Sequence, residues 1–362
     1  MSGGGDNSYE DGGTLRSPYD SDPLPEEDLW FLPGPGADAA PTDPPWPVAP
    51  RRDSLGPGAW RSAEAGEYRA LLRAAQAVAL FAERLRAAPE GLAGRLALMS
   101  VSAALRGEGI WLGPEQIALY RALRLGAGDM ARDLARAAWA VRRLEAGAAP
   151  QEGLRAFLGR SDVPDPQTAP GDDRPVGGEL DAAGRDWAAG LALLSDCHAM
   201  TRAAFGFASW RAGGLTPWED LLEATVAAQV VGAEGLAPFL PLSDGARIER
   251  HDLTAGAAGA GARLAAFYAA AEAGALRAAM ELARMVSWRD RACAATADLS
   301  GRTPPLLIGA LLRYPALSAE LAAQEAGVSR ASARRNLNLF ADRGLIREIT
   351  GQDRYRFWTA AA

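Results

Sequence analysis

The chain has 362 residues, of which 48% are hydrophobic, and a net charge of −7 at neutral pH, so it can hold two domains with a sizeable core. Every basic residue is an arginine, which excludes lysine-dependent catalysis and the lysine of a Walker-type phosphate loop. The two cysteines, Cys197 and Cys293, and the two histidines, His198 and His251, are too few and too dispersed for a zinc site. We therefore expect neither a metal nor a cofactor.

Residues 1–58 are predicted to form a disordered acidic arm. They are rich in Gly, Pro, Asp, Glu and Ser, and eleven acidic residues against three arginines give this arm a charge of −8. Such a composition buries too little apolar surface to offset the entropy lost on ordering. An apolar island at residues 29–32 is expected to dock on the chain's own domain or on a partner. The N-terminus lacks a signal-peptide pattern and no apolar run reaches membrane-spanning length, so we expect a cytoplasmic protein.

Helical periodicity dominates residues 59–298, which we predict to form an all-α multi-helix bundle. An acidic stretch rich in Pro and Gly, residues 160–178, is expected to be an exposed loop, and residues 238–242 an apolar extended segment. The expected helices cover residues 67–86, 92–106, 115–125, 129–145, 152–158, 180–211, 217–231 and 263–297.

The last of these helices, residues 263–297, is interpreted as both a linker and a dimer contact. Its periodicity predicts a charged side that contains Arg277, Glu281 and Arg284, and an apolar side that contains Leu276 and Met280. An apolar side on a long helix needs a partner, and a second copy of the chain could supply it.

Residues 302–362 follow the order of a winged helix-turn-helix. Three helices are expected at residues 304–313, 318–326 and 330–343, with Ser318 as an N-cap and Gly327 in the left-handed conformation between the second and third. The arms 345–350 and 354–358 then alternate at period two around a turn with glycine, which predicts a small β-hairpin. We therefore expect a mainly α protein: a disordered arm, a helical bundle and a C-terminal winged helix-turn-helix.

The helix at residues 330–343 is the predicted reader of duplex DNA. Ala333, Leu337 and Phe340 share its inner face, and polar residues occupy its outer face. Arginine pairs with guanine edges and asparagine with adenine edges in the major groove. The candidate contacts to bases or phosphates are Ser329, Arg330, Ser332, Arg334, Arg335, Asn336 and Asn338, and, at the tip of the hairpin wing, Arg354.

Charge is divided along the chain in a way that favours the same interpretation. Residues 302–358 hold nine arginines and five acidic residues, a net charge of +4, so the remainder carries −11. We predict a sequence-specific DNA-binding protein without enzymatic activity, a transcriptional regulator that binds double-stranded DNA as a homodimer. Winged helices also serve as protein-docking modules, so a non-catalytic scaffold stays open as an alternative.

The chain resembles a bacterial family in which an Ala-rich helical domain of unknown function precedes a C-terminal helix-turn-helix. The resemblance rests on residues 100–109, on residues 238–242 and on residues 345–351, and it covers about 300 residues, of which the last part is specific. Members of this family are regarded as DNA-binding proteins. The resemblance thus implies the same order of domains and says little about mechanism.

The layout is also similar to that of Fic proteins, which transfer a nucleotide monophosphate to hydroxyl groups and often carry a C-terminal winged helix. Their active loop reads His-x-Phe-x-Asp/Glu-Gly-Asn-Gly-Arg. Here His251 is followed by Leu253 at the aromatic position, Ala255 at the acid, Gly256 at the first glycine and Gly259 at the arginine. Without the acid and the arginine nothing would hold magnesium or the phosphates. A nucleotide-transferring enzyme with a divergent loop is therefore kept only as an alternative.

Overall fold

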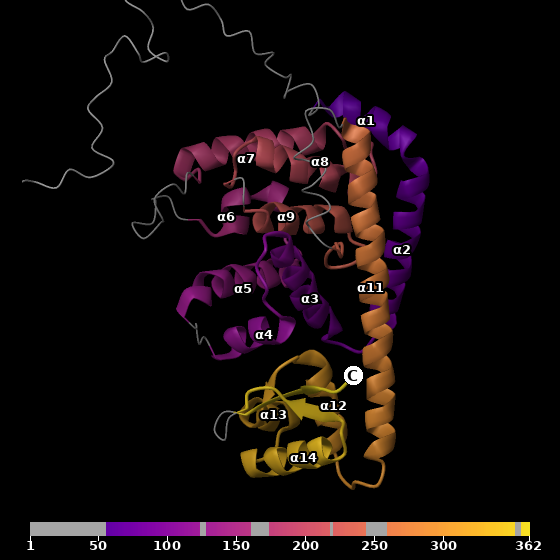
Figure 1. Ribbon diagram of the computed structural model, residues 1–362, viewed down its shortest axis with the longest axis vertical. Coiled ribbons are helices and arrows are strands. Elements are labelled where there is room, and N and C mark those ends of the chain that lie inside the picture. Colours follow the sequence, from indigo (N-terminus) through magenta and orange to yellow (C-terminus); the bar gives the residue numbers. More distant parts are fainter. Residues whose placement is uncertain (1–55, 124–127, 161–173, 218–219, 244–258, 352–355) are drawn as a thin grey trace, which may run out of the picture. The chain divides into compact units, whose positions relative to one another are not determined.

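The computed structural model describes residues 56–123, 128–160, 174–217, 220–243, 259–351 and 356–362. The described residues all belong to one compact unit, which is mainly helical and has a small three-stranded antiparallel sheet near its C-terminus (Figure 1). The predicted mainly α class is confirmed. Among the described residues, no helix combines the length and the apolar character that a membrane span requires.

Two predicted irregular segments lie largely outside the described residues. Most of the predicted arm, residues 1–58, is in this group, but its last two residues already belong to α1 (Pro57–Gly66). Pro57 occupies the first position of that helix, where its missing N–H costs no hydrogen bond. The predicted loop 160–178 is described only at its ends, and α7 begins within it at Gly177.

Helices α2 (Tyr68–Ala87) and α11 (Ala260–Ala295) lie side by side along most of α2 (Figure 1). Alanine supplies much of the buried stripe of both helices, with Gly274 added in α11, and small side chains let two helix backbones approach closely. Polar contacts join their outer edges, because Arg73 pairs with Glu272 at 3.4 Å and Arg84 donates to the Ala279 carbonyl at 3.5 Å.

Helices α4, α5 and α9 pack against α3, which is buried on most sides as its sequence predicted, whereas α7 packs against α6 and α8, and α8 packs against α9. The expected single helix 180–211 is wrong: it is two helices, separated by residues 193–198. The second one starts where the His198 imidazole caps it, and the Trp187 indole of the first donates to the Gly206 carbonyl of the second at 2.8 Å. The bounds of these helices are Leu92–Gly107 (α3), Pro114–Leu123 (α4), Ala131–Ala146 (α5), Leu154–Leu158 (α6), Gly177–Ala192 (α7), Ala199–Ala212 (α8) and Leu222–Ala233 (α9).

The two sides expected for α11 are reversed at three positions. Leu276 and Met280, expected on the apolar side, are 43% and 71% exposed, whereas Glu281, expected on the charged side, is buried. The helix instead buries a line of alanines with Leu282, because small residues fit against α2. Glu281 tolerates burial because Arg284 donates two hydrogen bonds to its carboxylate at 2.7 and 2.8 Å.

The C-terminal segment, residues 303–362, alternates helices and short strands. Its helices are α12 (Thr303–Arg313), α13 (Ala319–Ala326) and α14 (Arg330–Asp342), and its strands are β1 (Leu317–Ser318), β2 (Ile346–Glu348) and β3 (Phe357–Ala360). β3 lies in the middle of the sheet and pairs antiparallel with both neighbours. The predicted pairing of the two hairpin arms is present, with Ile346 opposite Ala360. Strand β1, which was not predicted, pairs Leu317 with Trp358.

Candidate nucleic-acid interface

Helix α14 begins with the local signals that its sequence carries. Gly327 adopts a φ of 60°, which ends α13, and the chain then turns into α14 within two residues. Ser329 is the N-cap, and its hydroxyl accepts the N–H of Ser332 at 3.2 Å. Ser329 is itself exposed, so the first turn of α14 faces solvent.

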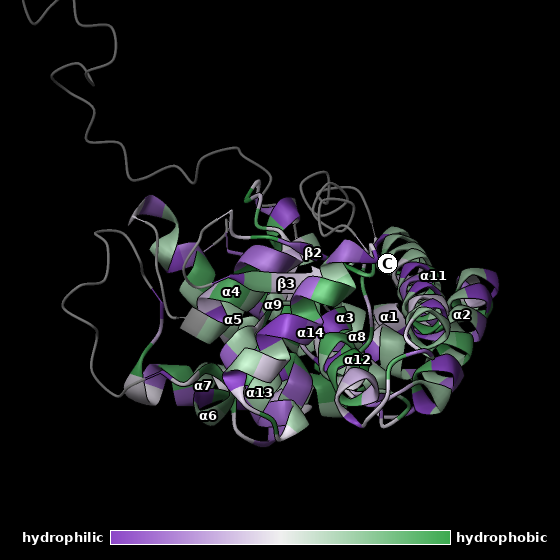
Figure 2. Ribbon diagram, turned by 90° about the horizontal axis from the view of Figure 1, so that it is seen from below, coloured by the Kyte–Doolittle hydropathy of each residue, from purple (hydrophilic) through white to green (hydrophobic). Residues whose placement is uncertain are grey.

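The orientation of α14 is set by three fully buried side chains. Ala333, Leu337 and Phe340 are each 0% exposed, as the periodicity predicted. They follow one another at helical spacing, so the opposite side of the helix must point outward. Arg334, Arg335 and Asn338 are exposed on that side. Figure 2, which is seen from the end of the molecule where α14 lies, shows hydrophilic residues along this helix.

The arginines of this outer face lack acidic partners, in contrast to their neighbours. Arg330, Arg334 and Arg335 are all exposed, and none of them forms an ion pair or a side-chain hydrogen bond with any described residue. Two other described arginines of the C-terminal segment have acidic partners. Arg313 bonds Glu325 at 2.9 Å, and Arg347 pairs with Glu115 of α4. Uncompensated positive charge is therefore concentrated on α14.

Not all predicted contact residues lie on the outer face. Ser332 and Asn336 are half-buried at the edge of the helix, and the Asn336 amide donates to the Ser332 carbonyl at 2.9 Å. This bond stabilises α14 locally and uses a donor that was expected to be free for DNA. Arg354 lies outside the described residues. The structure thus brings together Ser329, Arg330, Arg334, Arg335 and Asn338 as one exposed polar surface, hereafter the α14 face.

Two buried hydrogen bonds hold the C-terminal segment against the helical bundle. Arg95 of α3 donates to the Leu311 carbonyl of α12 at 2.9 Å, and the Trp288 indole of α11 donates to the Leu345 carbonyl at 2.7 Å. Burial lowers the pKa of Arg95 to about 10. The sequence did not indicate either contact, because each joins residues more than fifty positions apart whose side chains looked like ordinary helix residues.

A third contact fixes the far end of α14. Arg343, which follows the helix, pairs with Asp298 at 2.6 Å just beyond the end of α11. The hydrogen bond from this guanidinium holds the pKa of the Asp298 carboxyl below its usual value. The interaction connects the C-terminal end of α14 to the loop between α11 and α12, so Arg343 serves to position α14.

The histidines and the metal-ligating residue types form no second candidate site in the described residues. No group of His, Cys, Asp and Glu that could hold a metal occurs in the described part of the chain. His198 is a helix cap, since its Nδ1 accepts the Met200 N–H at 3.1 Å. His251 and the loop that was compared with the Fic motif lie outside the described residues.

The α14 face is therefore the best-defined candidate interface in the described residues, and it rests on the chain's own geometry. The resemblances given above stay predictions. No protein-family model matches this chain, and no curated protein sequence matches it.

Proposed function

We propose that the C-terminal segment is a winged helix-turn-helix and that the protein is a sequence-specific DNA-binding protein acting in transcriptional regulation. The order of its elements supports this: α12, β1, α13, a glycine turn, α14, then the antiparallel pair β2 and β3. In such a module the helix after the turn enters the major groove, and the strand pair forms the wing that touches the neighbouring backbone. α14 takes the place of the reading helix.

The observation that carries the proposal is the α14 face. Three guanidinium groups without acidic partners and one exposed amide stand on a helix whose opposite side is locked into the core. Arginine donates two bonds to a guanine edge, and asparagine both donates to and accepts from an adenine edge. Arg334, Arg335 and Asn338 point outward and are assigned to bases, whereas Arg330 and Ser329, at the start of the helix, are assigned to phosphates.

The distribution of charge favours binding through this end of the chain. Residues 302–358 carry +4 and the rest of the chain −11, so a polyanion is attracted to the C-terminal segment and repelled elsewhere. Because Arg313, Arg343 and Arg347 are already paired, the field that DNA meets comes largely from α14. Affinity should therefore fall steeply with salt concentration.

The test begins with selection of duplexes from a random DNA pool by the full-length protein. Selected duplexes are then titrated by fluorescence anisotropy with the wild type and with Arg335→Ala. Loss of a bidentate contact should weaken binding to the selected site by about 1–3 kcal/mol, or roughly 5- to 150-fold, and relax the preference at one base pair. The matched control is Arg185→Ala on α7, which removes the same charge from an exposed arginine and should leave affinity unchanged.

Three outcomes would contradict the proposal. The first is the absence of any selected sequence, and the second is binding that does not respond to salt. Either result would point to the alternative of a scaffold whose C-terminal segment binds protein. The third is transfer of label from a radioactive nucleotide to the protein or to a partner, which would support the nucleotide-transferring alternative instead.

A further inference from the structure

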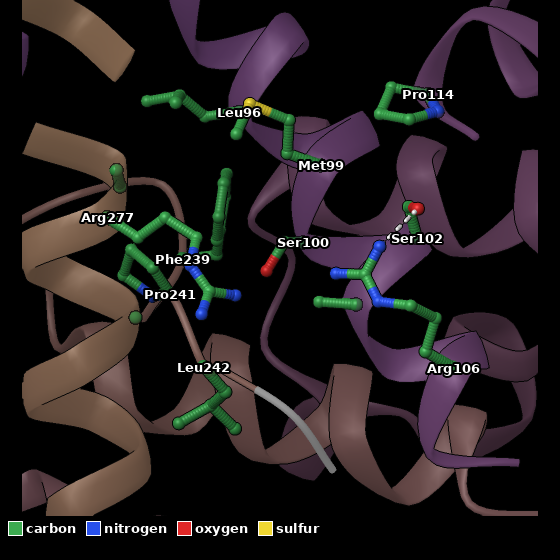
Figure 3. A pocket seen from close by; sticks show the side chains of 13 residues that line it. Leu96, Met99, Ser100, Ser102, Arg106, Pro114, Phe239, Pro241, Leu242 and Arg277 are labelled. Atoms are coloured by element: carbon green, nitrogen blue, oxygen red, sulfur yellow. Dashed lines mark hydrogen bonds between the residues drawn. The ribbon is translucent and has the colours of Figure 1, made fainter. Parts of the chain in front are cut away.

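A small cavity opens between α3, the apolar segment 238–242 and α11, far along the chain from the α14 face (Figure 3). It has a volume of about 100 Å³. Much of its wall is apolar, formed by residues such as Leu96, Met99, Phe239 and Leu242. An apolar cavity of roughly 150 Å³ holds benzene, so this somewhat smaller but open cavity fits a small molecule or the end of a larger one.

The wall on the side of the extended segment is held firmly in place. The Leu240 N–H donates to the Gln229 carbonyl of α9 at 2.8 Å, and the Ser243 N–H donates to the Ala270 carbonyl of α11 at 3.0 Å. At Gly274 of α11, a Cβ atom would lie only 2.3 Å from the Pro241 carbonyl oxygen, so only glycine allows this approach. The cavity is therefore preformed, as small-molecule sites usually are.

Two arginines that have no acidic partner among the described residues line this apolar cavity. Arg106 of α3 and Arg277 of α11 line the cavity, and their guanidinium groups point toward Ser100 from opposite sides (Figure 3). Neither forms an ion pair with a described residue, and no acidic side chain lines the cavity. Arg106 makes one long bond, 3.4 Å, to the Ser102 hydroxyl. Both guanidinium groups therefore keep donors that are available to a bound anion.

The third donor in the cavity is Ser100, which a buried glutamine orients. Gln229 of α9 is 0% exposed, and its amide donates to the Ser100 hydroxyl at 2.6 Å. Ser100 thus accepts from the glutamine, and its own proton has no acceptor among the described residues. Burying an amide is costly, and here the Gln229 side-chain oxygen has no hydrogen-bond partner. A function for the Gln229 amide would explain why it is buried at this cost: it orients the Ser100 hydroxyl toward a bound ligand.

A larger cavity elsewhere in the described residues lacks the unpaired arginines of the smaller one. A space of about 450 Å³ lies between α3, α4 and the start of α13. Its charged side chains are satisfied, because Arg121 forms two bonds to Glu145 at 2.9 and 2.7 Å and Arg313 bonds Glu325. It therefore offers volume but no unpaired charge to select a ligand.

We propose that the smaller cavity binds a small organic carboxylate. Arg106 and Arg277 would donate to the two carboxylate oxygens, Ser100 would donate a further bond, and the apolar part of the ligand would pack on Met99, Phe239 and Leu242. The site takes one negative charge joined to an apolar body. It is a ligand site of the helical bundle that does not depend on DNA binding by α14.

The test uses butyrate and benzoate as probes in isothermal titration calorimetry with the full-length protein and no DNA. Both probes should bind, whereas benzamide, which keeps the ring without the charge, and inorganic phosphate, which has charge without an apolar body, should bind at least roughly tenfold more weakly. Arg106→Gln and Arg277→Gln should each weaken benzoate binding by roughly tenfold or more. Both side chains are exposed, so the fold should persist, and thermal unfolding verifies this.

Arg185→Gln serves as the matched control, because it is an exposed arginine that does not line the cavity. It should bind benzoate like the wild type. The proposal is overturned if neither carboxylate binds at millimolar concentration, if phosphate binds as well as benzoate, or if the cavity variants bind benzoate as the control does. None of these measurements involves DNA, so their failure and the failure of the proposed function are separate results.

Discussion

At the scale of single residues, the protonation state of His198 decides whether this side chain can cap α8. Its neutral imidazole accepts the Met200 N–H at the start of α8, and protonation of Nδ1 would abolish this bond. Removal from water lowers the pKa of His198, although the Glu64 carboxylate opposes the effect. A histidine with a lowered pKa in the folded state contributes stability above its unfolded pKa and loses it as pH falls toward the folded pKa.

We therefore expect His198→Asn to reduce the pH dependence of stability. Asparagine also caps helices, so the variant should unfold at nearly the wild-type urea concentration at about pH 7.5. Between about pH 7.5 and about pH 5.5 the wild type should lose up to about 1 kcal/mol more than the variant, the usual worth of a cap. Equal losses for the two proteins in urea titrations at both pH values would show that the cap is not titrating.

If the protein binds DNA as proposed, a second residue, Arg330, is expected to contact phosphate groups and not bases. It lies in the first turn of α14, next to the N-cap, where helix N–H groups favour anions. Arg330→Ala should weaken binding to selected and unselected duplexes by the same factor and reduce the slope of log affinity against log salt by about one. Anisotropy titrations over a range of salt concentrations check this. A loss confined to the selected sequence would instead make Arg330 a base contact.

At the scale of elements, Glu108 ties three helices together. It follows α3, its side chain is only 4% exposed, and it accepts the N–H groups of Leu221 and Leu222 at 2.8 and 2.7 Å where α9 begins. Arg136 of α5 bonds both Glu108, at 2.8 Å, and Asp220, at 2.7 Å. The buried carboxylate thus replaces a side-chain N-cap for α9 and neutralises a partly buried guanidinium.

Glu108→Ala should therefore cost about 3–5 kcal/mol of unfolding free energy, because it leaves two helix N–H groups and part of a guanidinium without acceptors. Urea denaturation measures this loss. The matched control is Glu83→Ala on α2, which breaks an exposed pair with Arg86 and should cost less than about 1 kcal/mol. Similar losses for the two variants would show that the Glu108 contacts contribute no more than surface pairs.

The elements that could be predicted from the sequence are those with local signals. Ser318, Gly327 and Ser329 mark the ends of α13 and α14 through capping and a positive φ, and the spacing of Leu337 and Phe340 places the inner face. The candidate residues Arg334, Arg335 and Asn338 followed from that spacing. Features that depend on distant partners were not predictable, such as β1, which forms only because β3 lies beside it.

Helical periodicity also fails where a helix is buried all round or packs through alanine. The break at residues 193–198 contains no glycine or proline, and its sequence signal is the polar run Ser195-Asp196 before the cap His198, which helical periodicity alone does not detect. In α11 the alanines proved to be the packing side and Leu276 the exposed side, because α2 accepts small residues. The cavity could not be predicted from the sequence either, because Arg106 and Arg277 are far apart in the chain and look like ordinary surface charges.

At the scale of the whole molecule, the exposed apolar residues of α11 bear on the predicted homodimer. Leu276 and Met280 are 43% and 71% exposed and lie one helical turn apart, on a long helix that also holds the C-terminal segment through Trp288. Dimers that bind DNA read two half-sites, and the spacing of these sites reflects the distance between the two reading helices. An interface on α11 would therefore set that distance for α14.

We expect the double variant Leu276→Glu, Met280→Glu to be monomeric, because four buried carboxylates at a symmetric interface would be desolvated and would repel one another. Sedimentation equilibrium of the wild type and the variant measures the change. The variant should still bind a single half-site, because the α14 face is intact, but should lose the added affinity for two half-sites at the selected spacing. If the variant sediments like the wild type, the interface lies elsewhere. The control Arg291→Glu changes the charge of an exposed residue farther along α11 and should leave the assembly as it is.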